Sequence, residues 1–223
     1  MILDSEKEFK NKKYCYVQNG SSDLLIVLNT HNQKDRYFGY NSINNSIKDI
    51  DLLFLVDPNN KYYLDADEGK VYKELLAEIL LNYKSSDVSI VGTSMAGFAA
   101  LHFGMEFGLN VVAINPQLNL DSAYELAWDD LKNTLSNLES KLNIEELILK
   151  KYSGQTLFFV FGGHRLDLQA YNEFLSLDMS DVSFYIRRIE SPAHKFFLSD
   201  LGYLRDIHYT NKLLSEINGV LQP

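Results

Sequence analysis

The chain alternates between short runs of apolar residues and longer segments in which apolar residues recur at helical spacing. The runs are the length of a strand and are apolar at successive positions, which predicts strands that are buried on both faces. The predicted strands are residues 24–28, 52–56, 88–91, 111–114, 157–161 and 182–186, and residues 14–18 are a candidate edge strand.

Helical patterns separate these strands. Residues 69–84, 94–107 and 203–221 are predicted helices, and residues 119–155 carry leucines at helical spacing that predict two more. Buried strands alternating with helices predict a three-layer α/β/α sandwich with a mostly parallel central sheet. The insertion at about residues 119–155 is a candidate helical cap or flank.

Composition narrows the class of protein. The chain has 223 residues, of which 46% are hydrophobic, so we expect one domain over residues 1–223. The formal net charge of -9 argues against a nucleic-acid partner. The apolar runs are too short to insert into a membrane, and the start of the chain does not resemble a signal peptide, so we expect a cytoplasmic protein. Its single cysteine, Cys15, excludes an internal disulfide.

The segment Gly92-Thr93-Ser94-Met95-Ala96-Gly97 carries the strongest chemical signal. It joins a predicted buried strand directly to a predicted helix. A serine on such a tight turn has strained backbone angles, so small residues are needed two positions to either side of it. Gly92 and Ala96 meet that need, and the turn would expose the Ser94 hydroxyl at the carboxyl ends of the strands.

This segment resembles the nucleophile elbow of the α/β-hydrolase superfamily, with Ala96 in place of the usual second glycine. The order of elements is also similar over most of the chain. The resemblance implies a catalytic triad in the order nucleophile, acid, histidine. His194 lies between the sixth strand and the last helix, and Asp167 ends the glycine-bearing loop after the fifth strand. We therefore assign Ser94 as nucleophile, His194 as general base and Asp167 as the orienting acid; Asp178 and Asp181 are alternatives for the acid.

The same resemblance implies donors that stabilise an oxyanion. The first would be the backbone N–H of Met95, the residue after the nucleophile. The second would come from the loop after the first central strand, where Thr30 or His31 is the candidate. A structural reading of Ser94 as a helix-capping serine is the competing interpretation.

Other side chains are open to two readings. His164 lies in the loop of Asp167 and either lines the site or is an exposed loop residue; a metal site with Asp167 is not expected, because no third ligand has matching spacing. His102 is more simply packed or solvated, and His208 a surface group. Trp128 either faces substrate or packs in the core. Tyr62 and Tyr63 either form an aromatic wall beside the serine with Tyr37 and Tyr40, or are a structural cluster.

The sequence thus predicts a serine esterase that cleaves a small ester through an acyl-enzyme, with no cofactor or metal. The chain loosely resembles small bacterial esterases in its Asn115-Pro116 strand end. It also loosely resembles hydrolase-like proteins of surface-glycan modification, which implies an acetylated carbohydrate as substrate. The alternatives are an acyltransferase with the same triad and a non-catalytic partner protein of this fold. The sequence leaves the oligomeric state open.

Overall fold

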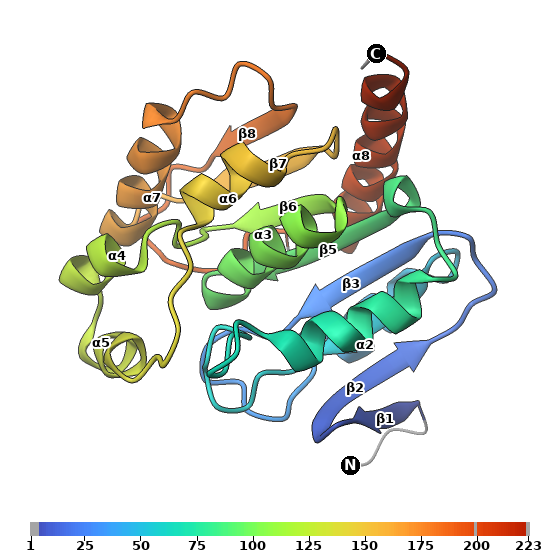
Figure 1. The fold of residues 1–223 in the computed structure, drawn as a ribbon, viewed down its shortest axis with the longest axis horizontal. Coiled ribbons are helices and arrows are strands. Elements are labelled where there is room, and N and C mark those ends of the chain that lie inside the picture. The colour runs from blue at the N-terminus through green and yellow to red at the C-terminus, as the bar shows by residue number, and fades with distance from the viewer. Residues whose placement is uncertain (1–4, 199, 222–223) are drawn as a thin grey trace.

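The computed structural model describes residues 5–198 and 200–221 (Figure 1). Its described strands form one sheet of eight, in the order β1-β2-β4-β3-β5-β6-β7-β8. The strands are β1 (Glu6–Phe9), β2 (Lys12–Val17), β3 (Leu24–Leu28), β4 (Asp51–Leu55), β5 (Val88–Thr93), β6 (Asn110–Ile114), β7 (Leu157–Phe161) and β8 (Phe184–Arg188).

The six strands from β3 to β8 run parallel to one another, as the sequence predicts. The strands β3, β4, β5 and β6 are buried at every position. This explains why their sequences are mostly apolar at successive positions instead of alternating.

Helices cover both faces of the sheet. They are α1 (Tyr40–Ser46), α2 (Lys70–Leu80), α3 (Met95–Phe107), α4 (Leu120–Leu126), α5 (Asp129–Ser136), α6 (Ile144–Lys151), α7 (Arg165–Ser176) and α8 (Leu201–Leu221). One apolar core joins α2, α3, α6 and α7 to one face, and a second core joins α1 and α8 to the other. In Figure 1 the helices α2 and α3 cross the front of the sheet. The predicted three-layer arrangement is therefore confirmed.

Several details differ from the prediction. Two antiparallel strands, β1 and β2, extend the sheet beyond β4, so the edge strand is β1 and not the predicted segment 14–18. The insertion at residues 119–155 holds three short helices instead of two, and α6 packs against α3 within a helical layer. The strand β8 lies two residues later than the predicted 182–186, and its last two residues, the exposed Arg187 and Arg188, pair with β7 although apolar patterning does not mark them.

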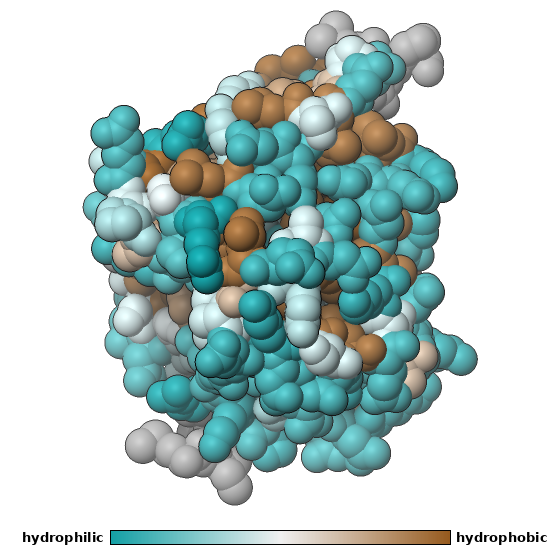
Figure 2. Space-filling view, turned by 90° about the vertical axis from the view of Figure 1, so that its left-hand side faces the viewer, coloured by the Kyte–Doolittle hydropathy of each residue, from teal (hydrophilic) through white to brown (hydrophobic). Residues whose placement is uncertain are grey.

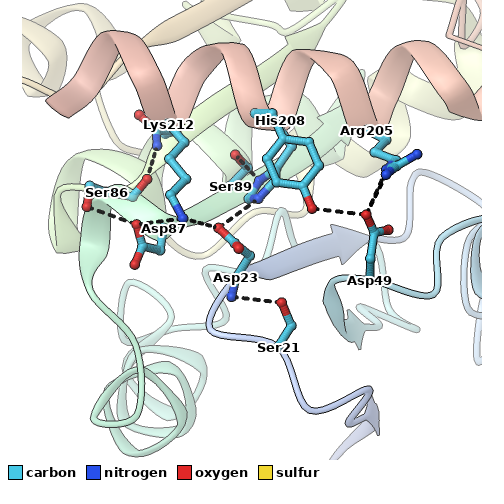
Figure 3. A network of polar contacts seen from close by, with 11 residues as sticks. Ser21, Asp23, Asp49, Ser86, Asp87, Ser89, Arg205, His208 and Lys212 are labelled. Atoms are coloured by element: carbon cyan, nitrogen blue, oxygen red, sulfur yellow. Dashed lines mark hydrogen bonds and ion pairs between the residues drawn. The ribbon is translucent and has the colours of Figure 1, made fainter. Parts of the chain in front are cut away.

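The C-terminal helix is held to the sheet by buried polar contacts (Figure 3). His208, predicted to lie at the surface, is fully buried, and its Nδ1 lies 2.9 Å from the Ser89 hydroxyl. Lys212 lies 2.7 Å from Asp23 and 3.2 Å from Asp87. These contacts lie where β3 and β5 begin, at the opposite end of the sheet from Ser94. Among the described helices, none combines the length and apolar character needed to cross a membrane.

Candidate active site

Ser94 occupies the turn between β5 and α3 with φ 55° and ψ -121°. Non-glycine residues rarely adopt such angles, and the strain costs about 1–3 kcal/mol. The turn closes so tightly that a Cβ on Gly92 would lie 2.0 Å from the carbonyl oxygen of Ala96. Gly97 also packs closely against Pro116: a Cβ on Gly97 would lie 3.1 Å from the Cα of Pro116. The strained elbow predicted from the spacing of small residues is therefore present.

The Ser94 hydroxyl is buried and accepts a hydrogen bond from the Gln117 side chain, at 3.0 Å from its Nε2. The Tyr62 hydroxyl donates to the other end of that amide, at 3.1 Å from Oε1, and so fixes its orientation. Gln117 is fully buried. Sequence analysis missed it, although a search of the residues that follow each parallel strand would have included it.

Asp167 and His194 are paired. The carboxylate Oδ1 of Asp167 lies within hydrogen-bond distance of His194 Nδ1, which sets the imidazole orientation. Asp167 lies in the first turn of α7 and not at the end of a loop as predicted, because α7 begins at Arg165 with His164 as its N-cap. The alternative acids, Asp178 and Asp181, follow the other end of α7.

The other ring nitrogen of His194, Nε2, is buried and has no hydrogen-bond partner among the described residues. Ser94 and His194 line the same cavity but are not hydrogen bonded to each other in this structure. The hydroxyl is directed to Gln117 instead. A proton transfer from Ser94 to His194 therefore requires the two side chains to come within hydrogen-bond distance of each other.

This cavity has a volume of about 340 Å³ and lies at the carboxyl ends of the strands. Trp128, at the start of α5, forms one wall, with its ring centroid 5.6 Å from that of His194. Phe38 and Phe196 form another and contact each other edge to face at 4.9 Å. Its described lining residues are Thr30, His31, Asn32, Phe38, Thr93, Ser94, Trp128, His194, Lys195 and Phe196.

The three predicted oxyanion residues all lie near Ser94. Met95 begins α3, so its N–H belongs to the first helical turn, whose N–H groups have no acceptor within the helix. The Thr30 hydroxyl donates to the Thr93 carbonyl at 2.8 Å, and its N–H makes a 3.3 Å contact with Gln33. His31 Nε2 lies 2.8 Å from the Thr134 hydroxyl of α5, and burial lowers the pKa of His31.

Asn115 connects two of the loops that form the site. It follows β6 with a positive φ of 48°. Its side chain donates to the Lys195 carbonyl at 2.9 Å and accepts from the Gly162 N–H at 2.8 Å. It therefore fixes the loop that carries His194 relative to the segment that leads to Asp167.

Two aromatic residues proposed as a wall of the site are structural. Tyr62 and Tyr63 are fully buried. The Tyr63 hydroxyl donates to Asn29 at 2.8 Å, and the Tyr63 N–H donates to the Asp57 carboxylate at 3.0 Å. Burial raises the pKa of Asp57 to about 6. These contacts hold the segment after β4 together and attach it to Asn29, which follows β3.

The sequence offers no third metal ligand at a matching spacing from His164 and Asp167. The fold nevertheless brings a third potential ligand, His194, to them. His164, Asp167 and His194 each offer one potential ligand atom, and these atoms lie within 4.8 Å of one another. The third residue comes from a loop 27 positions beyond Asp167, so local spacing cannot reveal it.

The sheet order, the strained serine after β5 and the acid and histidine after β7 and β8 are together decisive for the fold. The chain has the α/β-hydrolase fold. Among solved structures of this fold, the capsule O-acetyltransferase of Neisseria meningitidis serogroup A is similar with a TM-score of 0.72 and 17% identity, covering 94% of this chain and 96% of that one.

Two hydrolases share the α/β-hydrolase fold of this chain. An esterase of Pyrococcus furiosus has a TM-score of 0.65 and 14% identity, with 96% of this chain and 90% of that chain covered. The fluorophosphonate-binding serine hydrolase F of Staphylococcus aureus has a TM-score of 0.59 and 15% identity, with 96% and 95% covered. Residues 57–153 match the uncharacterised protein family UPF0227. No curated protein matches the sequence.

Proposed function

We propose that this protein is a serine hydrolase that cleaves small esters through an acyl-enzyme on Ser94. The observation that carries the proposal is the combination of a serine on a strained elbow with a hydrogen-bonded Asp167–His194 pair around one cavity. A merely capping serine needs neither the strain nor the pair.

The chemistry follows from these positions. Ser94 turns from Gln117 to His194, and the imidazole takes the hydroxyl proton as the oxygen attacks the ester carbonyl. Asp167 holds the imidazole orientation and stabilises its charged form. The Met95 N–H, with Thr30 or His31 as second donor, holds the oxyanion. The alcohol leaves with the proton from His194, and water then attacks the acyl-enzyme by the same route.

The shape of the site favours a short acyl group. The cavity of about 340 Å³ is at the small end for ligand pockets. Figure 2, which views the side of the molecule that is on the left in Figure 1, shows a mostly hydrophilic surface, with its broadest hydrophobic area near the top of the view and smaller patches elsewhere. A long lipid chain would need a larger continuous apolar surface. An acetyl ester of a carbohydrate fits these limits, with Trp128 as an aromatic surface on which a sugar ring can stack.

An acyltransferase is the second candidate, and the similarity to a capsule O-acetyltransferase favours it. A sugar hydroxyl would then replace water as the acceptor of the acyl group from Ser94. Product analysis with and without a glycan acceptor separates the two reactions, because only the transferase forms a new glycan ester.

The test is a series of nitrophenyl esters of increasing acyl length, together with labelling by a fluorophosphonate probe. We expect the native protein to prefer the acetyl ester and to be labelled. Ser94→Ala should abolish labelling and lower kcat at least about a thousandfold, whereas the matched control Ser176→Ala at the end of α7 should behave as native. A Ser94→Ala variant as active as the native protein, or a native protein that is not labelled, contradicts the proposal.

A further inference from the structure

Three potential metal ligands converge beside the serine. His164 is the N-cap residue of α7, Asp167 lies in the first turn of that helix, and His194 arrives from the loop after β8. Their ligand atoms lie within 4.8 Å of one another. The ring centroids of the two histidines are 5.8 Å apart. Two imidazoles and a carboxylate are a donor set that zinc sites in proteins use.

Two atoms of this cluster are buried and have no hydrogen-bond partner among the described residues. They are the second carboxylate oxygen of Asp167, Oδ2, and His194 Nε2. The Asp167 side chain is 0% exposed. A buried acceptor without a donor is costly, and a cation would satisfy it. In the proposed mechanism His194 Nε2 accepts the proton of Ser94, which explains why this nitrogen is unpaired. The mechanism gives no partner to the unpaired Oδ2 of Asp167.

The cluster can close around an ion with small movements. Zinc binds imidazole nitrogen at about 2.0–2.1 Å and carboxylate oxygen at about 2.0–2.2 Å, so the ligand atoms must approach one another further. His164 is only half-buried, and its Nδ1 makes a long 3.3 Å cap contact with the Leu166 N–H. Its ring is therefore the part of the cluster that can move.

We propose that His164, Asp167 and His194 form a site for a divalent zinc ion, and that zinc bound there switches the hydrolase off. The inhibition rests on the proposed function, whereas the binding does not. An imidazole nitrogen that binds zinc cannot accept the serine proton, and a carboxylate that binds zinc no longer orients the imidazole. Zinc thus prevents the triad from assembling, and removal of zinc by a chelator restores activity.

The binding test uses zinc alone and the Ser94→Ala variant of the full chain, so its outcome does not depend on catalysis. Titration calorimetry should detect one zinc ion per chain. His164→Asn removes a ligand but keeps a residue type that caps helices well, so folding is retained. We expect zinc affinity to fall at least about tenfold in His164→Asn and to be largely retained in His164→Asp, which keeps both a ligand and a cap.

A second histidine near the cavity provides the matched control. His31 Nδ1 lies 3.8 Å from Asp130 and is the other His–carboxylate contact in this region. His31→Gln should leave zinc affinity unchanged. Equal zinc affinity in His164→Asn and its parent, or loss of binding in His31→Gln alone, would overturn the assignment of the site.

The inhibition test measures ester hydrolysis of the chain with Ser94 intact, against buffered free zinc. Zinc should lower the rate of the native protein, and chelation should restore it. His164→Asn, compared with its own zinc-free rate, should need at least about tenfold more zinc. Zinc that binds at His164 without lowering the rate refutes the switch. Zinc binding in a chain that hydrolyses no ester supports the site and contradicts the proposed function.

Discussion

The backbone at Gly92 decides whether Ser94 can sit on its turn. A methyl group there would lie 2.0 Å from the Ala96 carbonyl oxygen, and neither atom belongs to a flexible side chain. Any larger residue must therefore open the turn and displace Ser94. The requirement for a small residue is steric and local, so the spacing of small residues in the sequence is enough to predict the turn.

Gly92→Ala should destabilise the protein by about 3 kcal/mol or more and abolish fluorophosphonate labelling, because the elbow cannot close. Denaturant unfolding measures the loss. Gly219→Ala is the matched control, since a Cβ at this exposed position of α8 meets no atom within 4 Å. It should raise stability by about 0.5–1 kcal/mol, because alanine is the better helix former. A fully stable Gly92→Ala protein would show that the turn is less confined than described.

Residues whose position is set by local sterics or chain order were predictable, and residues whose position is set by long-range contacts were not. Ser94, Asp167 and His194 follow a pattern of small residues and a sequence of strand ends. Gln117 and Asn115 act through side-chain amides that meet residues 23 and 80 positions away in the chain. No spacing rule distinguishes such an amide from any other polar residue at the end of a strand.

At the scale of elements, α3 is buried on nearly all sides, and this places a titratable residue in the core. His102 is 1% exposed, stacks on Phe103 with ring centroids 4.8 Å apart, and has an Nδ1 with no hydrogen-bond partner among the described residues. Burial lowers the pKa of His102 to about 4. The histidine is therefore neutral in the folded protein at neutral pH.

His102 should make the protein less stable as the pH falls. Between about pH 6.5 and pH 4 the unfolded chain takes up a proton at His102 that the folded chain refuses, so protons favour unfolding. His102→Leu lacks this proton uptake. Relative to the native protein, its free energy of unfolding should improve by up to about 3 kcal/mol between pH 7 and pH 4.

Denaturant unfolding of both proteins across this range measures the difference, and the opposing contribution of Asp57, whose pKa is raised, is common to both and cancels. Phe174→Leu is the control: this buried aromatic residue of α7 packs on Phe159 and Phe184, and its loss should change stability by the same amount at every pH. A native-to-His102→Leu difference that does not vary with pH would contradict the burial of a neutral imidazole.

Elements were predicted best where one physical pattern dominates. The central strands are mostly apolar because both faces are covered, and their predicted bounds fall within two residues of those observed. The insertion was harder to predict, because α4, α5 and α6 are short and join at Trp128 and Asn143, which cap helices from extended backbone. Leucines at helical spacing predict that the segment is helical, but they do not predict where one short helix ends and the next begins.

At the scale of the molecule, the two ends of the sheet differ in what they contact. The carboxyl ends hold the cavity with Ser94 and His194, whereas the amino ends of β3 and β5 contact α8. There Lys212 contacts Asp23 and Asp87 together, and both carboxylates are mostly buried (Figure 3). The last helix is thus attached by one ammonium shared between two acids that precede separate strands.

Lys212→Met should lower stability by about 2 kcal/mol, because it leaves two neighbouring carboxylates mostly buried without a cation. Arg205→Met is the matched control on the same helix: its ion pair with Asp49 is about half exposed, so water and salt already screen it, and its loss should be the smaller. Under conditions where it is folded, Lys212→Met should be labelled by the fluorophosphonate probe at the native rate. The reason is that the Lys212 contacts and the cavity lie at opposite ends of the sheet. Slower labelling by the folded variant would instead mean that attachment of α8 is transmitted through β5 to the serine.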